Sequence, residues 1–289
     1  TVHFPIWHQE IEDILVLKNN KGTEDNRVRK LDYSIQITKL FYERFMNDED
    51  ITLFSPHDAP GLYDAFGTDK FDALYKKYEK DSSVNKKTIP AQDLFSDLLK
   101  ERAETGRIYI MNLDHCNSHS SFKDKVSMSN LCQEITLPTT PISSIDDSQG
   151  EIALCILSAI NVGQLNNLDD LENLCELTVR ALEEIIEYQD YPVLAAELST
   201  KSRRSLGIGY IGLAHYLAKQ GHKYHDKGAW DSVDRLSEAF QFYLLKASNK
   251  IAQEKGACEG FKQTKYADGL LPIDHYKKDV DKIVPHKQR

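Results

Sequence analysis

The sequence has little of what several classes of protein require. No apolar run approaches the roughly 20 residues of a membrane-spanning helix. The first residues, TVHFPIWHQE, lack the basic start and the apolar stretch of a secretory signal peptide. Basic residues are in deficit, because 36 Lys and Arg stand against 45 Asp and Glu and leave a formal net charge of −9. Nucleic-acid backbones bind to basic surfaces. We therefore expect no membrane partner and no nucleic-acid partner.

Cysteines are few, and neither their number nor their spacing suggests disulfide pairing. The 289 residues contain five cysteines, an odd number, and none of them forms a CxxC motif. A reducing, cytoplasmic environment fits this pattern better than a secreted disulfide framework. Cys175 and Cys258 are most simply structural, whereas the pattern does not decide the role of Cys116.

The segment HCNSH, residues 115–119, contains the residue types of a metal site. Together with Cys132 and Cys155 downstream, its spacing matches no common zinc pattern. We therefore predict no metal site. His115 and His119 are interpreted as loop residues that form hydrogen bonds.

The segment GIGYIG, residues 207–212, matches GxGxxG. A dinucleotide-binding fold needs an apolar strand directly before such a motif, but the polar residues STKSRRS precede it here. Close packing of a turn onto a helix explains these glycines better.

Apolar spacing predicts helices interleaved with strands. RIYIMNLDH has the pattern of a strand, and the mostly apolar EIALCILSAINV that of a strand buried on both faces. This order favours an α/β domain with a largely buried sheet, and it does not separate a barrel from an open sheet. Helices are predicted over residues 11–17, 31–47, 71–80, 91–106, 168–192 and 231–255. The fourth ends at Gly106, a residue suited to the position after a helix end. The apolar stripe of the fifth runs through Leu171, Leu174, Thr178, Leu182 and Ile185, with Val179 and Ile186 widening it.

The segment SNLCQEI, residues 129–135, combines an amide, a thiol and a carboxylate. If the segment is extended, Asn130, Cys132 and Glu134 point to the same face. Burying that face without a function would require partners for the amide and the carboxylate, because unmatched polar groups are costly. We therefore predict that this face does chemistry.

A carboxylate near the thiol limits the reactions that Cys132 can perform. It disfavours the thiolate that acyl-transfer nucleophiles use, so a hydrolase would need a histidine near Cys132. A neutral thiol suits hydrogen-atom transfer, which needs an S–H bond. Cys155 lies in the next apolar run, and neighbouring strands can bring two such positions together. A thiol hydrolase stays open here as a weaker alternative.

Several segments resemble one enzyme family. SNLCQEI resembles the active-cysteine segment of the large (α) subunit of class I ribonucleotide reductase, in its bacterial and phage class Ia branch. The likeness covers essentially the whole chain, through GRIYIMNLDHCNSHSSF, GEIALCILSAINVG, EYQDYP, RRSLGIG, LLKASN and LPIDHYKKD, and nearer the N-terminus through LVLKNNKG, NRVRKLDY and EDITLFSPHDAPGLYDAF.

The resemblance implies roles for individual residues. Cys132 matches the cysteine that becomes a transient thiyl radical and removes the 3′-hydrogen of the substrate ribose. Glu134 matches the carboxylate that takes the 3′-hydroxyl proton, and Asn130 matches the amide that hydrogen-bonds the ribose hydroxyls. Asn130, Leu131 and Glu134 together match substrate-binding positions. Cys155 matches one of two cysteines that reduce the 2′ carbon and end as a redox-active disulfide.

The family fold is a ten-stranded α/β barrel with the active cysteine on a central finger loop. We expect residues 1–289 to form a single partial catalytic barrel domain, which lacks the activity cone, the first barrel strands and the C-terminal tail. The disulfide partner of Cys155 would then lie outside this chain. The implied function is a share in reducing ribonucleoside diphosphates to 2′-deoxyribonucleoside diphosphates, with no turnover by the fragment alone. A non-catalytic α/β interaction module, or an inactive fragment of that subunit, is the alternative.

The resemblance implies partners rather than a cofactor bound by this chain. A metal-containing β subunit would supply the radical, and ATP or deoxynucleoside triphosphates would regulate the full subunit. Thioredoxin or glutaredoxin would reduce the disulfide. The remaining segments of the α subunit and an α homodimer would complete the assembly, in the cytoplasm of a bacterium or a phage-infected cell.

Overall fold

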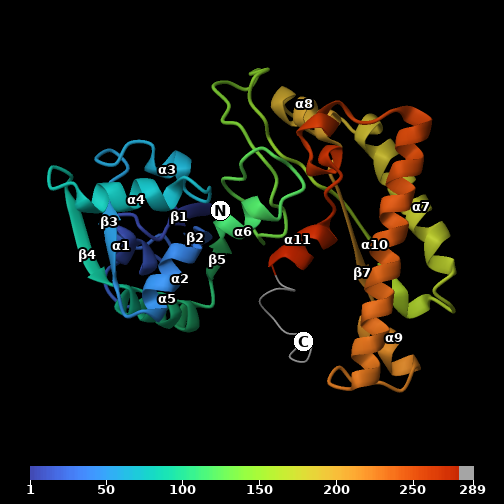
Figure 1. Cartoon of the computed structure of the whole chain (residues 1–289), viewed down its shortest axis with the longest axis horizontal. Coiled ribbons are helices and arrows are strands. Elements are labelled where there is room, and N and C mark those ends of the chain that lie inside the picture. The colour runs from blue at the N-terminus through green and yellow to red at the C-terminus, as the bar shows by residue number, and fades with distance from the viewer. Residues whose placement is uncertain (280–289) are drawn as a thin grey trace. The chain divides into compact units, whose positions relative to one another are not determined.

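The computed structural model describes the backbone of residues 1–279 and divides the chain into two compact units (Figure 1). Among the described residues, unit 1 comprises Thr1–Thr139 and residues 268–279, and unit 2 comprises Thr140–Ala267. The expectation of one domain over residues 1–289 stays a prediction. No helix within residues 1–279 has both the length and the apolar character that crossing a membrane requires.

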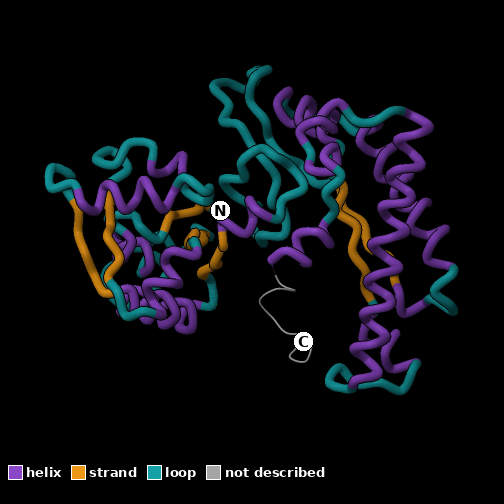
Figure 2. The backbone as a smooth tube through the Cα atoms, in the orientation of Figure 1, coloured by secondary structure: helices purple, strands orange, loops and turns teal. Residues whose placement is uncertain are grey.

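A three-stranded parallel sheet organises unit 1 (Figure 2). Its strands are β1 (Val2–Pro5), β2 (Tyr33–Ile37) and β5 (Ile108–Asn112), in the order β1-β2-β5. The strand predicted from RIYIMNLDH is confirmed by β5.

The helix predicted over residues 31–47 is wrong in its first half. Residues 33–37 form β2, and only α2 (Lys39–Met46) is helical. Tyr33, Ile35 and Ile37 are fully buried. Their two-residue spacing is that of a strand, and pairing with β1 on one side and β5 on the other overrides the helical alternative.

The two faces of β2 differ in character. Tyr33, Ile35 and Ile37 belong to the apolar core, which also contains side chains of the helices α1 (Ile11–Leu15), α2, α4 (Phe71–Lys80) and α5 (Ala91–Thr105). Ser34 and Gln36 alternate with them and are equally buried, so the opposite face of this strand is polar. That polar face positions the candidate site.

The remaining elements of unit 1 include two strands that the sequence pattern did not predict. These are β3 (Asp50–Phe54) and β4 (Lys86–Pro90), which pair antiparallel. Gly106 follows α5 with φ of +66°, which confirms its predicted place after a helix end. The elements are α1 (Ile11–Leu15), η1 (Glu24–Asn26), β3 (Asp50–Phe54), α3 (Leu62–Ala65), α4 (Phe71–Lys80), β4 (Lys86–Pro90), α5 (Ala91–Thr105), α6 (Leu113–Ser118) and α11 (Pro272–Asp279).

Unit 2 is built on two parallel strands and two long helices. The strands β6 (Ile156–Asn161) and β7 (Leu206–Ile211) pair in parallel, and α7 (Asp170–Tyr188) packs against α10 (Lys227–Lys255) (Figure 1). The shorter elements are η2 (Val162–Gln164), α8 (Leu194–Arg203), α9 (Leu213–Lys219), η3 (Glu259–Gln263) and η4 (Lys265–Asp268).

The predicted stripe of α7 is correct in part. Leu171 and Leu182 are buried, but Leu174 and Ile185 are 36% and 44% exposed. The buried face also contains Val179 and Ile186, which were predicted to widen the stripe, and Cys175, which confirms a structural place for this thiol. The error arises because α7 has apolar residues on both sides of that face, and spacing alone does not choose between them.

The strand predicted within EIALCILSAINV exists, but its burial on both faces is wrong. Leu157 is 58% exposed and Ile211 on β7 is 55% exposed, whereas Ile160 is buried. Helix α7 contacts β6 and β7, so the buried side is the one that faces a helix. The strands within residues 1–279 form sheets of three, two and two strands and do not close into a barrel.

Candidate functional site

Side chains from three elements fix the segment that leads to Cys132. Asn117 of α6 bonds both backbone groups of Val126, at 2.8 Å to its N–H and 3.0 Å to its carbonyl. Gln36 of β2 donates to the carbonyl of Ser127 at 2.7 Å. His3 of β1 contacts the backbone of Ser129, with its Nε2 2.9 Å from the carbonyl oxygen. The segment is therefore tied to the polar side of the unit 1 sheet.

Residues 129–135 form a closed loop. The hydroxyl of Ser129 donates to the carbonyl of Ile135 at 2.6 Å, and the Oδ1 of Asn130 accepts from the N–H of Ile135 at 3.0 Å. Inside the loop, the N–H of Gln133 donates to the carbonyl of Asn130 at 3.3 Å. Gln133 has φ of +65°, the left-handed conformation that turns the chain back.

The prediction of an extended SNLCQEI is therefore wrong. Asn130, Cys132 and Glu134 share one loop but not one face of a strand, because the left-handed Gln133 interrupts the alternation. The two residues at the base of the loop supply the hydrogen bonds that would otherwise come from a neighbouring strand. Cys132 and Glu134 are exposed, and Leu131 is 49% exposed.

The carbonyl oxygen of the Asn130 side chain already has a structural task. It holds the loop closed through Ile135, so its amide nitrogen is the atom left for another ligand. The thiol of Cys132 is exposed at the tip of this loop. The arrangement presents a thiol, an amide donor and a carboxylate on a short loop with a fixed base.

Cys155 belongs to unit 2 and lies directly before β6. The register of β6 and β7 sets Leu157 opposite Gly207. A Cβ atom at Gly207 would lie 2.8 Å from the Sγ of Cys155 and 2.5 Å from the Cδ2 of Leu157. The half-buried thiol therefore lies close against the β7 backbone, and only glycine leaves room for it there.

Comparison with known proteins shows the family to which this chain belongs. Residues 1–288 match the family model described as "Ribonucleotide reductase, barrel domain". The chain belongs to this family. It is 57% identical over 288 residues to the ribonucleoside-diphosphate reductase subunit alpha of Haemophilus influenzae, and that alignment covers 98% of this chain and 38% of the relative.

Two other relatives agree. The ribonucleoside-diphosphate reductase 1 subunit alpha of Escherichia coli is 56% identical, with 98% of this chain and 38% of the relative covered. The alpha subunit of Enterobacteria phage T4 is 43% identical, with 99% and 38% covered. The chain thus spans about two fifths of the length of these curated relatives.

The other motifs singled out by sequence take structural places in this member of the ribonucleotide reductase barrel family. His115 lies in α6, so its predicted place in a loop is wrong, whereas His119 follows the last helical residue as the C-cap. Their rings stack with centroids 5.9 Å apart. Within residues 1–279, no group of three or more His, Cys, Asp or Glu side chains is arranged to hold a metal ion.

The GIGYIG segment is part of β7 and of the turn that follows it. Helix α8 precedes it, so the absence of a preceding strand is confirmed. Gly212 has φ of +78° at the start of α9, which fits the predicted turn onto a helix. Gly207 instead lies within the strand, where it accommodates Cys155.

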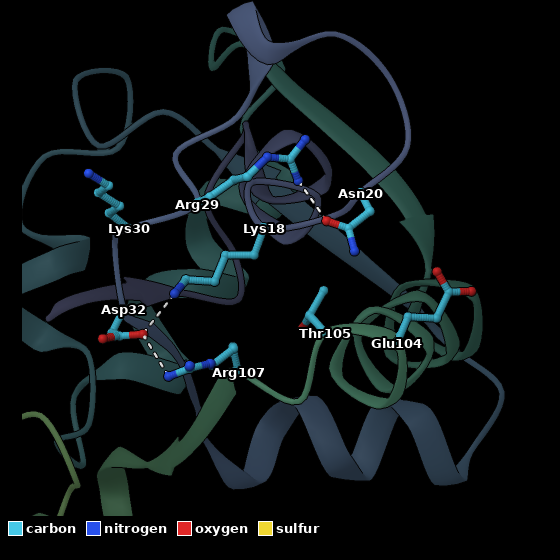
Figure 3. Close-up of a pocket in the computed structure, with 8 residues that line it drawn as sticks. All are labelled: Lys18, Asn20, Arg29, Lys30, Asp32, Glu104, Thr105 and Arg107. Carbon is cyan, nitrogen blue, oxygen red and sulfur yellow. Dashed lines mark hydrogen bonds and ion pairs between the residues drawn. The ribbon is translucent and has the colours of Figure 1, made fainter.

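A polar pocket of about 430 Å³ lies elsewhere on unit 1 (Figure 3). Lys18, Arg29 and Arg107 line it together with Asp32, and none of the predicted site residues does. The carboxylate of Asp32 lies 2.7 Å from the Nζ of Lys18 and 3.9 Å from Arg107. These contacts partly compensate the positive charges inside the pocket.

Sequence reasoning missed the residues that hold the loop. Ser34 and Gln36 alternate with apolar residues in YSIQI, and that period was a usable sign of a strand with one polar face. Nothing in the sequence connects His3 to Ser129, because the two are 126 positions apart. Such a contact becomes visible only in the folded chain.

Proposed function

We propose that this chain supplies the reaction-centre part of a class I ribonucleoside-diphosphate reductase α subunit. One observation supports this most: an exposed Cys132 on a loop with a fixed base, within SNLCQEI, in a chain of the ribonucleotide reductase barrel family. The names of the relatives supply the substrate class, ribonucleoside diphosphates.

The proposed chemistry assigns one task to each loop residue. The thiyl form of Cys132 takes the hydrogen atom from C3′ of the ribose, so a C–H bond breaks, an S–H bond forms and the radical moves to the sugar. Glu134 accepts the proton of the 3′-hydroxyl. The amide of Asn130 and the segment at Leu131 hold the ribose against these groups.

The reduction itself needs two electrons. Cys155 and a second cysteine outside this chain provide them: the 2′-hydroxyl leaves as water, C2′ gains a hydrogen and the two thiols become a disulfide. Cys132 then returns its hydrogen atom to C3′ and is again a thiyl radical. Thioredoxin or glutaredoxin then restores the thiols by disulfide exchange. In this proposal a metal-containing β subunit supplies the radical, nucleotides act as effectors of the full subunit, and the site of action is the cytoplasm.

Reconstitution tests the proposal. The chain is combined with polypeptides that supply the rest of an α subunit and with a β subunit, and formation of deoxyribonucleoside diphosphate is measured. We expect no turnover from the chain alone and turnover from this reconstituted assembly. Cys132→Ser should abolish turnover, whereas Cys116→Ser, at a half-buried thiol on α6, should retain most of it. Deoxynucleotide formation by the Cys132→Ser assembly would refute the proposal.

The same assembly separates the alternatives. A non-catalytic interaction module would form a homo-oligomer and ignore both β subunit and nucleotide. A thiol hydrolase using Cys132 would show rapid alkylation of that thiol at neutral pH, because its nucleophile is a thiolate. Slow alkylation together with β-dependent turnover supports the reductase.

A further inference from the structure

His3 is in direct contact with the segment that carries Cys132. It lies on β1 opposite Ser34 of β2 in the strand register. Its Nδ1 is 2.6 Å from the hydroxyl of Ser34, and its Nε2 is 2.9 Å from the carbonyl oxygen and 3.3 Å from the nitrogen of Ser129. The imidazole thus spans from the sheet to the base of the loop.

The imidazole can satisfy both neighbours while neutral. A neutral ring has one N–H donor and one acceptor nitrogen. The shorter contact is with the carbonyl of Ser129, which favours the proton on Nε2. The hydroxyl of Ser34 then donates to Nδ1, and because Ser34 is fully buried, this bond also satisfies its own polar group.

Ser129 transmits this contact to the loop. Its side chain donates to the carbonyl of Ile135, so the residue gripped by His3 is the residue that closes the loop. The next residue, Asn130, makes the second closing bond to Ile135. A shift of the Ser129 backbone therefore moves both ends of residues 131–134, the stretch that contains Cys132.

A second anchor acts two residues further along β2. Gln36 holds the carbonyl of Ser127 and lies on the same face as Ser34. It restrains the entry to the segment but makes none of the loop-closing contacts. Removing the His3 contact therefore leaves the segment attached and frees the loop base.

We propose that His3 is a positioning residue for Cys132, acting through Ser129. The imidazole fixes the base of the loop against the sheet, and the hydrogen bonds of Ser129 and Asn130 to Ile135 carry that restraint to the thiol. The consequence for turnover rests on the proposed function. The consequence for loop order does not.

Two substitutions that differ by one methylene test the contact. The amide of His3→Gln reaches toward Ser129 as Nε2 does, whereas His3→Asn has an amide near the position of Nδ1 and retains only the partner in Ser34. Hydrogen exchange of the Ile135 amide, which donates to Asn130, reports loop opening in the 289-residue chain. Amides of β2 report whether the sheet itself stays folded.

We expect His3→Asn to speed exchange at Ile135 about tenfold, the size of one lost hydrogen bond, and His3→Gln to stay within about twofold of the original chain. His8→Asn, at a histidine outside the loop contacts, is the control and should change nothing at Ile135. Unchanged exchange in His3→Asn, or equal effects of Asn and Gln at position 3, would overturn the inference.

Turnover of the reconstituted assembly extends the test. His3→Asn should lower kcat about tenfold while KM for the ribonucleotide changes less than about twofold, because a misplaced reacting atom affects the chemical step more than substrate binding. His3→Gln should recover most of kcat. If Cys132→Ser still turns over, the proposed function fails. If Cys132→Ser is inactive and His3→Asn has the original kcat, only the role of His3 fails.

Discussion

Both oxygens of the buried Glu101 carboxylate accept hydrogen bonds from a single group, the Nδ2 amide of Asn19, at 2.8 and 2.6 Å. Helix α5 is thereby joined to the loop after α1. The backbone carbonyl of Asn19 also accepts hydrogen bonds from the guanidinium groups of Arg27 and Arg29. This one residue therefore holds the loop together and also provides the hydrogen-bond donor for Glu101.

Asn19→Ala should lower the free energy of unfolding of unit 1 by about 2–3 kcal/mol, because it leaves a buried carboxylate without its donor. Urea denaturation followed by the fluorescence of Trp7 measures this, in a Trp230→Phe background so that only unit 1 reports. Asn20→Ala is the control, since Asn20 is exposed and bonds Arg29 at the surface, and we expect less than about 0.5 kcal/mol there. Equal losses in the two variants would contradict this account of Glu101.

Arg44 and Glu79 form a largely buried two-point ion pair, with side chains 12% and 17% exposed and both N–O distances at 2.5 Å. Arg44→Met should cost about 3 kcal/mol in the same assay, because the carboxylate stays buried without its cation. The surface pair of Lys39 and Glu43 provides the comparison, and Lys39→Met should cost less than about 1 kcal/mol. A smaller loss from Arg44→Met than from Lys39→Met would be inconsistent with a buried pair.

Gly207→Ala should disturb β6 and the thiol beside it. The added methyl would meet the Sγ of Cys155 and the side chain of Leu157, so we expect a loss of about 1–3 kcal/mol. Hydrogen exchange of the β6 and β7 amides gives this value, and peptide mapping after alkylation shows a changed rate at Cys155. Gly209→Ala has nothing within 4 Å of its new methyl and should leave both readouts unchanged. Matching behaviour of the two alanines would show that Cys155 does not need the space at Gly207.

Asp147 gives a prediction of pH dependence. Hydrogen bonds from the backbone N–H groups of Ser143 and Gln149 lower the pKa of Asp147 from 3.8 to about 2. A lowered folded pKa means that these bonds stabilise the turn above about pH 4 and are lost as the pH falls toward about 2. The amide chemical shift of Ser143 should therefore titrate with a midpoint near pH 2. Asp147→Asn should remove the transition, and a midpoint near pH 4 would show that the bonds do not persist in solution.

Patterns within short stretches of the sequence predicted the elements that are determined by nearby residues. The helices α7 and α10 follow from long periodic runs, and Gly106 follows from the need for a left-handed residue after a helix. In β2, the same apolar residues fit a helix or a strand, and pairing with β1 and β5 decided between them. The chemistry proposed for Asn130, Cys132 and Glu134 could be argued from the sequence because the three residues are close together in it.

The conformation of the loop at residues 129–135 could not be predicted from the sequence. Gln133 adopts a left-handed conformation that its residue type does not demand. The closing bonds of Ser129 and Asn130, and the distant contact of His3, hold the loop around it. Alternation along SNLCQEI assumes a neighbouring strand, and the side chains at the loop base take the place of that neighbour.

The ion pairs between α7 and α10 also determine the offset at which the two helices pack. Glu172, Glu176 and Arg180 face Lys246, Lys250 and Glu254 in turn, at N–O distances of 2.6, 2.8 and 2.6 Å. In the first two pairs the negative charge is on α7, whereas in the third pair it is on α10. If one helix slid along the other by about one turn, either Arg180 would meet Lys250 or Glu176 would meet Glu254, and like charges would oppose each other. The two helices can therefore pack at only one offset without placing like charges opposite each other.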